Sequence, residues 1–215
     1  MRVPRPFRPM QILALLLASV LAAHAADVNG IPNFHKVSDT LYRGAQPSDQ
    51  SYDGLAKLGV KTVLDLRRPE EHSTSAEAKL VKEAGMNYVN IPMTGFQTPN
   101  ADQLSSVRAV LDTGGVVFVH CKKGKDRTGT VVALSRIERE GWTNDRAFAE
   151  AKDLGIHWYF TGLKNLIRTY KVDPVVAAKY AKASTNTATP AVVLTATPDS
   201  SAVETVGAQG SELKQ

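Results

Sequence analysis

Hydrophobic residues along this chain follow two alternating patterns, each typical of one kind of secondary structure. Short runs of apolar and β-branched residues predict buried strands, here at 60–66, 88–93 and 116–119. Apolar residues that recur about every three to four positions, with Gly or Pro near the ends, predict helices. These helices are expected at 48–57, 75–83, 100–111, 128–140, 143–154, 159–170 and 173–182. Two shorter extended segments, 34–37 and 40–43, flank a Ser38-Asp39 turn.

The alternation of strands and helices predicts the fold class. A chain organised in this way is expected to form an α/β domain, with a central, mainly parallel sheet flanked by helices on both sides. We expect this domain to span residues 26–183, because beyond Ala183 the sequence has little charge and no amphipathic period. Residues 184–215, rich in Ser, Thr and Ala, are expected to form a disordered tail.

The N-terminal residues have the pattern of a secretory signal peptide. Three arginines within residues 2–8 precede an apolar run at 12–23, and Ala23-His24-Ala25 fits the small-x-small pattern of a cleavage site. We therefore expect residues 1–25 to be removed and the protein to be periplasmic or secreted. An uncleaved anchor is the alternative, although the apolar run is short for a membrane span and no other stretch could form one.

Charge and cysteine content narrow the possible partners. The formal net charge is +5, and loss of the three arginines of the expected signal peptide would bring it to +2. A charge this small does not indicate nucleic-acid binding. The single cysteine, Cys121, has no partner for an internal disulfide, which suits a thiol that stays free in an oxidising compartment.

The segment with candidate chemistry follows the predicted strand at 116–119. It contains His120 and Cys121, then a polar loop, then Arg127 at the start of a predicted helix. A strand, a loop and a helix N-terminus in this order form an anion site, because loop amides point inward and the helix dipole adds partial positive charge. A cysteine in such a place is expected to be a thiolate.

The spacing Cys-x5-Arg distinguishes this site from other anion sites. Arg127 offers a planar fork that can hold two oxygens of a phosphoryl group. A Cys121 thiolate beside it can attack phosphorus in line and form a phosphocysteine. Gly124 would let the loop backbone turn inward, and Gly129 would permit close helix packing. Thr128 could donate its hydroxyl to the sulfur and ease departure of the thiolate in the second step.

Two segments carry a resemblance to a known family. Residues 120–129, HCKKGKDRTG, resemble the HCxxGxxR(S/T)G loop of cysteine-dependent protein tyrosine and dual-specificity phosphatases. Residues 42–48, YRGAQPS, resemble the N-terminal segment of atypical dual-specificity phosphatases. The resemblance covers about residues 33–171. It implies the cysteine-phosphatase fold and hydrolysis of phosphomonoesters with no metal or organic cofactor, because the loop itself stabilises the charge.

Several nearby residues are expected to have structural roles. Arg43 is interpreted as an ion-pair partner, and His120 is expected to hydrogen-bond the loop backbone and so set the geometry of Cys121. The charged residues at 67–71 follow a strand, where α/β sheets place ligand loops. They are nevertheless more simply a solvated loop or a set of ion pairs. The aromatic residues at 157–160 could sit under the loop, with core packing the simpler role.

The sequence leaves the proton donor open. Cysteine phosphatases usually supply the proton from an Asp on a loop that corresponds here to 93–99, and this loop contains no acid. Asp126 is the favoured candidate, since myotubularin-like and Sac-type phosphatases resemble this chain in having Asp there. A carboxyl beside bound phosphate also tends to keep its proton. Asp102 is the alternative, although the dipole of the predicted helix already explains an acid in its first turn. A leaving group that needs little help is the third possibility.

Lysines in the loop bear on the substrate. Three of them converge on one anion site, which favours a polyanionic substrate such as an inositol phosphate or a phosphoinositide. Phosphotyrosine or phosphoserine/threonine proteins are the alternative, because tyrosine phosphatases also tolerate lysines there. The residues predicted to bind substrate are His120, Lys122, Lys123, Gly124, Lys125 and Gly129.

Together these features predict an exported, cysteine-dependent phosphatase. Cys121 is the expected nucleophile, Arg127 the phosphate clamp, Thr128 the aid to the leaving thiolate and Asp126 the favoured acid. The competing prediction is a catalytically weak module that only binds a phosphorylated ligand. The intact Cys-x5-Arg pair argues against that module, and the missing loop acid argues for it. A third possibility is an interaction protein whose tail is the functional part. The sequence does not indicate an oligomeric state.

Overall fold

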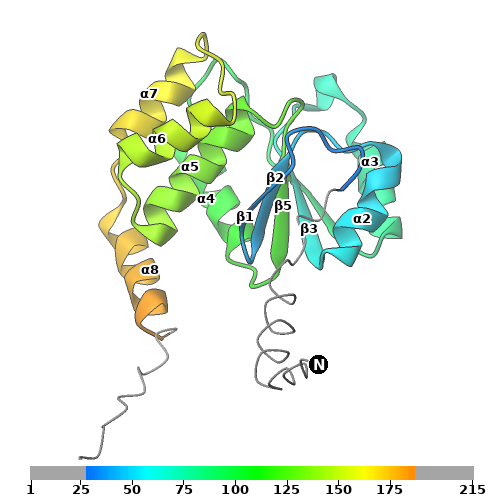
Figure 1. Cartoon of the computed structure of the whole chain (residues 1–215), viewed down its shortest axis with the longest axis horizontal. Coiled ribbons are helices and arrows are strands. Elements are labelled where there is room, and N and C mark those ends of the chain that lie inside the picture. Colours follow the sequence, from blue (N-terminus) through cyan, green and yellow to red (C-terminus); the bar gives the residue numbers. More distant parts are fainter. Residues whose placement is uncertain (1–27, 187–215) are drawn as a thin grey trace, which may run out of the picture.

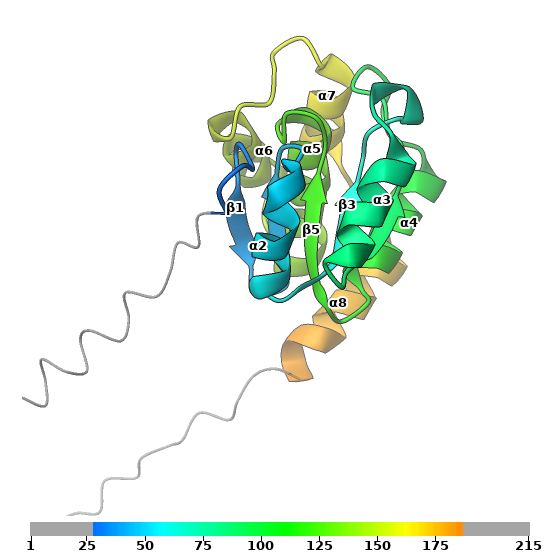
Figure 2. The ribbon, with the colours of Figure 1, turned by 90° about the vertical axis from the view of Figure 1, so that its right-hand side faces the viewer.

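The computed structural model of this chain describes residues 28–186. The expected signal peptide, residues 1–25, and all of the expected tail beyond Asn186 lie outside the described residues. The described part contains a five-stranded sheet with helices on both faces, as Figure 1 and Figure 2 show. The predicted α/β class with a mainly parallel sheet is therefore confirmed.

The sheet has the order β1-β2-β5-β3-β4. Strand β1 is antiparallel to β2, and all other neighbouring strands are parallel. The strands are β1 (His35–Ser38), β2 (Leu41–Gly44), β3 (Val60–Asp65), β4 (Asn87–Asn90) and β5 (Val116–His120). The helices are α2 (Tyr52–Lys57), α3 (Thr74–Glu83), α4 (Ala101–Leu111), α5 (Asp126–Glu140), α6 (Asn144–Asp153), α7 (Thr161–Thr169) and α8 (Pro174–Asn186), with short 3-10 turns η1 (Asp49–Ser51) and η2 (Pro69–Glu71).

The predicted elements differ from the observed ones mainly at their ends. The strand expected at 88–93 ends at Asn90, although the N–H groups of Ile91 and Met93 still donate to the carbonyls of Asp65 and Leu66. Helix α8 continues to Asn186, past the boundary expected after Ala183. Helix α5 begins at Asp126, two residues before the expected start at Thr128. Asp126 is therefore a helical residue rather than a loop residue.

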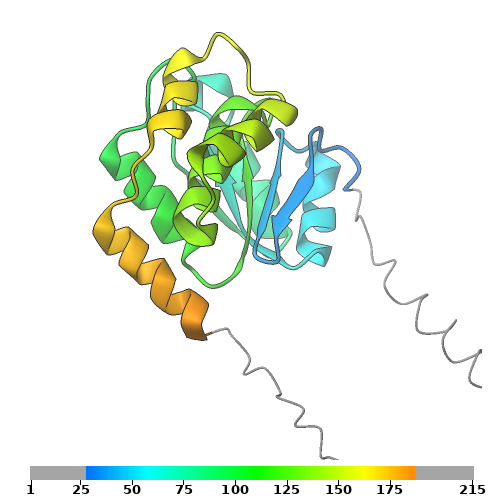
Figure 3. The ribbon, with the colours of Figure 1, turned by 60° about the vertical axis from the view of Figure 1, so that its left-hand side comes forward.

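Helices cover the two faces of the sheet differently. Residues of α2 and α3 pack with Phe118 in one apolar cluster. Residues of α4 and α5 pack on the other face in a second cluster. Helices α6 and α7 pack against the outer side of α5, as Figure 3 shows. The helices predicted at 143–154 and 159–170 thus form a second helical layer on one face of the sheet.

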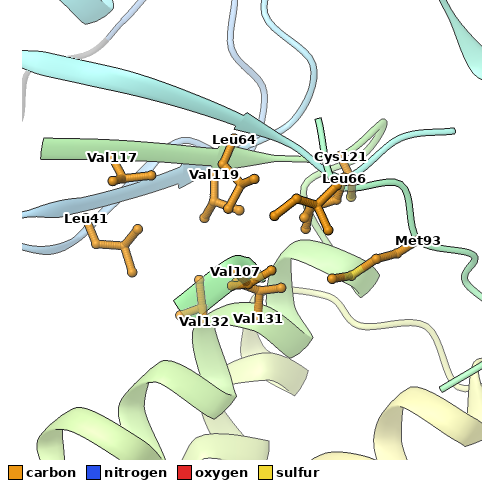
Figure 4. Close-up of a cluster of buried hydrophobic side chains, with 11 residues drawn as sticks. Leu41, Leu64, Leu66, Met93, Val107, Val117, Val119, Cys121, Val131 and Val132 are labelled. Carbon is orange, nitrogen blue, oxygen red and sulfur yellow. The ribbon is translucent and has the colours of Figure 1, made fainter. Parts of the chain in front are cut away.

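Side chains along β5 alternate between these two faces, as the period of two in a strand requires. Val117, Val119 and then Cys121 point toward α5, as Figure 4 shows for the cluster that contains them. Phe118 and His120 face the α2 and α3 layer instead. Consecutive residues His120 and Cys121 therefore enter two different environments.

The carboxyl ends of the parallel strands meet at one edge of the sheet, which is where α/β folds place ligand sites. The loops after β3, β4 and β5 all leave from this edge. None of the helices within residues 28–186 is long and apolar enough to cross a membrane.

Candidate active site

The loop between β5 and α5, residues 121–125, is fixed to the end of β2 through Gly124. The carbonyl oxygen of Gly124 accepts a hydrogen bond from Asn33 Nδ2 at 2.8 Å and one from Arg43 Nη2 at 2.6 Å. Gly124 has a φ of +66°, a conformation that side chains disfavour. A Cβ there would lie 2.5 Å from the nitrogen of Ala45 and closer still to the carbonyl of Gly44. Only glycine fits this position without moving the backbone.

Arg43 supports this loop from beneath. Its side chain is 1% exposed, and among the residues described it forms no ion pair, so the expected ion-pair role is corrected to a hydrogen bond with the Gly124 carbonyl. Burial lowers the pKa of the Arg43 guanidinium, and a negative charge on Cys121 opposes that shift. Arg43 therefore places a buried positive charge close to the loop.

Cys121 is buried at the start of the loop and is not among the residues that line the pocket beside Arg127. It is 2% exposed and packs with Leu66 and Val131 in the cluster on the α5 face (Figure 4). Burial acts to lower the pKa of Arg127, and the hydrogen bonds to Glu71, followed by a negative charge on Cys121, raise it. For Arg43, a negative charge on Cys121 opposes the effect of burial less than Glu150 does. Both guanidinium groups therefore favour the thiolate form at this position over the thiol.

Arg127 is held in one orientation by groups from two other loops. Its Nη1 donates to the carbonyls of Leu66 at 3.3 Å and Met93 at 3.1 Å. Glu71 accepts from Nη1 at 2.6 Å and from Nη2 at 3.1 Å. Within residues 28–186, Nε has no hydrogen-bond acceptor. The Nε–Nη2 edge is thus available for two oxygens of a phosphoryl group.

Glu71 is ionised in this arrangement. Burial acts to raise the pKa of Glu71. The hydrogen bonds from the Arg127 side chain and the Arg68 backbone nevertheless hold this pKa below its usual value. Ion pairing was one of the two simple interpretations of the charged residues at 67–71. The pair between Glu71 and Arg127 confirms ion pairing for Glu71, and Arg68 and Glu71 also line the pocket described next.

An open pocket of about 500 Å³ lies beside Arg127. Its walls come from the loops after β3 and β4, from the start of α5 and from the segment before α7. The lining residues are Arg68, Glu71, Thr94, Gly95, Phe96, Gln97, Asp126, Arg127 and Phe160. The loop at 93–99, in which the sequence shows no acid, is thus a wall of the pocket.

Asp126 is the acidic residue of the predicted set that reaches this pocket. It is 7% exposed, and its Oδ1 accepts the backbone N–H of His157 at 2.7 Å. The Nδ1 atom of His157 lies 2.9 Å from each carboxylate oxygen. The other candidate acid, Asp102, is exposed in the first turn of α4 and is not among the residues that line the pocket.

Aromatic residues form one side of the pocket and continue onto the surface. The rings of Phe96 and Phe160 are 5.0 Å apart, and both line the pocket. Trp158 and Tyr159 are exposed beyond them, Trp158 by 79%. Core packing, the simpler expectation for 157–160, is therefore wrong for Trp158 and Tyr159.

The predicted lysines lie around the loop rather than inside the pocket. Lys122 and Lys123 are exposed, and neither is among the lining residues. Lys125 is partly buried, and its side chain extends over Gly155, where an added Cβ would be 3.2 Å from its Cε. The pocket walls themselves carry two arginines and two acids.

Two predicted helix residues lie under the loop. Thr128 is fully buried, and within the described residues its hydroxyl has no hydrogen-bond partner, the Cys121 sulfur included. At Gly129 an added Cβ would meet Arg43 Nη2 at 3.8 Å and Ala151 at 4.0 Å, which are ordinary contact distances. Close packing is therefore not demanding at Gly129.

His120 does not join this site. Its side chain is fully buried on the opposite face of the sheet, where Nε2 lies 3.2 Å from Glu77 Oε1 without hydrogen-bond alignment. The expected hydrogen bond to the loop backbone is not formed in the part of the chain that is described. Period-two alternation explains this outcome, because Cys121 faces α5 and its neighbour His120 must then face the other side.

A network of buried charged groups surrounds His120. Arg67 donates to Asp65 Oδ1 at 2.9 Å and to Oδ2 at 3.0 Å, and it also contacts Glu77. His72 Nε2 lies 2.7 Å from Asp65 Oδ2. The sequence contained a signal for this network, since Asp65 and His120 share a face at the ends of adjacent strands.

The same network contains a possible set of metal ligands. Asp65, His72 and Glu77 each offer a ligand atom within 4.8 Å of the others. The Arg67 guanidinium bonds both carboxylates, however, and already supplies the positive charge that a metal would bring. These residues therefore do not fit a metal ion.

Comparisons with known proteins agree with the resemblance in residues 42–48 and 120–129. The family model described as "DSP-PTPase phosphatase fused to NAD+ Kinase" matches residues 26–155. The dual specificity protein phosphatase TpbA of Pseudomonas aeruginosa (strain UCBPP-PA14) is 32% identical over 163 residues, covering 66% of this chain and 72% of TpbA. The inositol diphosphatase DSP3 of Arabidopsis thaliana is 29% identical over 143 residues, covering 63% of this chain and 69% of DSP3.

Solved structures give the same result for the fold. The crystal structure of a cysteine-to-serine variant of P. aeruginosa TpbA in complex with pTyr has a TM-score of 0.58 to this chain at 26% identity. The match covers 74% of this chain and 94% of that one. The similarity therefore extends over most of the described residues.

Proposed function

This chain belongs to the dual-specificity (DSP-PTPase) family of phosphatases, and from that premise we propose that it hydrolyses phosphomonoesters through a phosphocysteine intermediate. The family makes it a phosphatase; the mechanism and residue roles are our proposal. The observation that carries the proposal is the orientation of Arg127. Glu71 and two backbone carbonyls hold its guanidinium so that the Nε–Nη2 edge is unoccupied beside the pocket.

In the first step, Cys121 Sγ attacks phosphorus while Arg127 binds two phosphoryl oxygens. The amides of residues 122–127 and the N-terminus of α5 stabilise the charge on the phosphoryl group. The bond from phosphorus to the leaving oxygen breaks, and Asp126 donates a proton to that oxygen. In the second step, water attacks the phosphocysteine and gives a proton to Asp126. The sulfur leaves as a thiolate, assisted by the hydroxyl of Thr128.

Two substrate classes have support. TpbA is named a dual specificity protein phosphatase and has been crystallised with pTyr, whereas DSP3 is named an inositol diphosphatase. We favour aryl phosphoesters such as phosphotyrosine, because Phe96 and Phe160 line the pocket while Lys122 and Lys123 do not. Inositol phosphates and phosphoinositides are the second candidate, supported by the exposed lysines beside the loop.

We also propose export from the cytoplasm, with residues 1–25 as the signal, 26–183 as the phosphatase domain and 184–215 as a tail. The support is the sequence pattern of arginines, apolar run and Ala23-His24-Ala25. Expression of the full chain in a Gram-negative host, followed by fractionation and N-terminal sequencing, tests it. A periplasmic product starting at Ala26 supports export, and a cytoplasmic product that retains Met1 contradicts it.

Phosphate release by the full chain without added metal tests the mechanism. The panel is 4-nitrophenyl phosphate, a phosphotyrosine peptide, a phosphoinositide and an inositol polyphosphate, with Cys121→Ser as control. We expect turnover that is lost in Cys121→Ser and is fastest on the two aryl phosphates. Turnover that survives in Cys121→Ser would overturn the cysteine mechanism. Binding of vanadate without turnover on any substrate would favour the binding module.

A further inference from the structure

His157 binds Asp126 through two different donors from the segment between α6 and α7. The backbone N–H of His157 donates to Oδ1 at 2.7 Å, and its ring Nδ1 lies 2.9 Å from Oδ1 and from Oδ2. We propose that His157 is a positioning residue that holds the Asp126 carboxyl with Oδ2 directed to the leaving group. This proposal rests on the proposed function, in which Asp126 is the acid.

The two carboxyl oxygens of Asp126 are not equivalent. Oδ1 is close to two nitrogen donors, whereas Oδ2 is close to one. An ionised carboxylate only accepts hydrogen bonds, so Nδ1 must carry a hydrogen whenever Asp126 is ionised. Oδ2 therefore has more unused hydrogen-bonding capacity than Oδ1, and Asp126 is a lining residue of the pocket. Oδ2 is therefore the atom best placed to carry the transferable proton.

Without these donors, the carboxyl of Asp126 would have competing partners. Asp126 is the first residue of α5, and an acid at a helix start readily bonds the free backbone N–H groups of the first turn. That conformation would turn the carboxyl away from the pocket and toward the helix axis. The bonds from His157 oppose it, and they do so from a segment that itself ends at the pocket residue Phe160.

The proton balance of the reaction does not require His157 to change charge. As the S–P bond forms and the bond to the leaving oxygen breaks, the proton on Oδ2 passes to that oxygen. As water adds to phosphorus and the S–P bond breaks, a water proton returns to Oδ2. In both steps the Nδ1–H and backbone N–H of His157 remain bonded to the carboxyl. His157 therefore acts through Asp126 and does not need to touch the substrate.

Leaving-group dependence separates this role from a merely structural one. Phenyl phosphate has a poor leaving group and needs the acid, whereas 4-nitrophenyl phosphate needs it much less. For His157→Phe we expect kcat/KM to fall about 30-fold with phenyl phosphate and less than about threefold with 4-nitrophenyl phosphate. The Phe ring keeps the packing against Tyr159 and Phe160, and the backbone N–H remains.

Two amide variants provide a second test that does not depend on Phe being tolerated. Asn at 157 places an N–H donor near the position of Nδ1, whereas Gln places it near Nε2. His157→Asn should restore kcat/KM for phenyl phosphate to within about threefold of the wild type, and His157→Gln should not. Trp158→Phe, in the adjacent exposed residue, is the matched control and should behave as the wild type on both substrates.

The outcomes separate this inference from the proposed function. Equal losses on both substrates, no loss in His157→Phe, or equal activity of the Asn and Gln variants would overturn the role of His157. Asp126→Asn should show the same selective loss, and adding His157→Phe to it should cause no further loss. If Asp126→Asn shows no selectivity, the acid of the proposed function is wrong. If Cys121→Ser retains turnover, the cysteine mechanism itself is wrong.

Discussion

The two faces of the sheet bury charged groups at the same edge but use them differently. On the α5 face, Arg127 lines an open pocket, and its Nε has no hydrogen-bond partner in the described residues. On the α2 and α3 face, Asp65 and Glu77 share Arg67 in a buried network, and none of these three residues lines that pocket. The open edge of Arg127 prepares the first face for an anion, whereas the charged groups of the second face bond one another and have a structural role.

Two tyrosines add hydrogen bonds to this buried network, although Arg67 Nη1 and both ring nitrogens of His120 have no partner in the described residues. Tyr52 donates to Glu77 and Tyr88 donates to Asp65, each at 2.8 Å. Burial and the neighbouring carboxylates raise the pKa of both phenols. Removal of one group from this network would leave a buried charged or polar group without its partner and without water to replace it, which lowers the free energy of unfolding. Changes on the two faces should therefore separate catalysis from stability.

Among the changes considered, removal of Arg127 should have the largest effect, and this effect should be on catalysis. Arg127→Ala is expected to lower kcat/KM with 4-nitrophenyl phosphate by about 10³-fold or more, because an arginine that stabilises a transferring phosphoryl group contributes that much. Steady-state kinetics measures it. Arg136 lies on the same helix, bonds the carboxylates of Glu140 and Glu150, and does not line the pocket. Arg136→Ala should change kcat/KM by less than about threefold; equal losses would contradict the clamp.

Removal of Glu77 should give the largest effect on stability. Glu77→Ala leaves the buried Arg67 guanidinium short of a partner, so the free energy of unfolding should fall by about 3–5 kcal/mol. Urea unfolding measures it, and kcat/KM of the folded fraction should stay near the wild-type value. Glu83→Ala on the exposed side of the same helix should cost less than about 1 kcal/mol. A loss of activity without loss of stability would break the contrast between the faces.

Gly124→Ala should affect both stability and activity, because Gly124 packs against β2 and lies in the loop between Cys121 and Arg127. The positive φ and the contact with the Gly44 carbonyl together should cost about 2–4 kcal/mol of unfolding free energy and lower activity. Thermal unfolding and kinetics measure the two losses. Gly85 also has a positive φ, +77°, but has nothing near its Cβ position. Gly85→Ala should lower the free energy of unfolding by about 1–2 kcal/mol and leave kcat/KM unchanged. An equal effect at both glycines would show that the contact between the added Cβ and the Gly44 carbonyl does not matter.

Glu71→Gln should have a smaller effect that separates binding from turnover. The amide orients Arg127 less firmly, so kcat should fall about tenfold. Loss of the negative charge should also make inhibition by vanadate somewhat tighter. Glu70→Gln removes the same charge from an exposed neighbour and should leave kcat unchanged. An unchanged kcat in Glu71→Gln would mean that the two backbone carbonyls are enough to orient Arg127.

The smallest effect concerns stability at low pH. Burial acts to raise the pKa of the Asp65 carboxyl. The hydrogen bonds and charge of Arg67, together with a charge on His120, outweigh burial and hold this pKa below its ordinary 3.8. A folded pKa below the unfolded one gives stability that is complete above pH 3.8 and is lost as pH falls through the folded value. Urea unfolding should therefore show stability falling below about pH 4. Asp65→Asn should flatten this fall, whereas Asp39→Asn, in an exposed pair with Lys36, should not.

Local features of the site were predictable because each depends on neighbours in the chain. The strand 116–119, the spacing of Cys121 and Arg127 and the glycine at 124 all follow from residues within about ten positions. For the proton donor, the sequence left three possibilities open: Asp126, Asp102 and a leaving group that needs little help. Burial in the pocket wall favours Asp126, and the sequence could not show that α5 starts there.

The sequence by itself determined the α/β class, the family resemblance of the loop at 120–129 and the spacing of Cys121 and Arg127. Only the tertiary structure decided which groups hold them: Arg43 on Gly124 across 81 positions, Glu71 on Arg127 across 56 and His157 on Asp126 across 31. Strand and helix patterns depend on local spacing, whereas these hydrogen bonds depend on which strands lie side by side and how the helices pack. Strand alternation, which is local, puts His120 and Cys121 on opposite faces, and helix packing decides which groups each of them meets there.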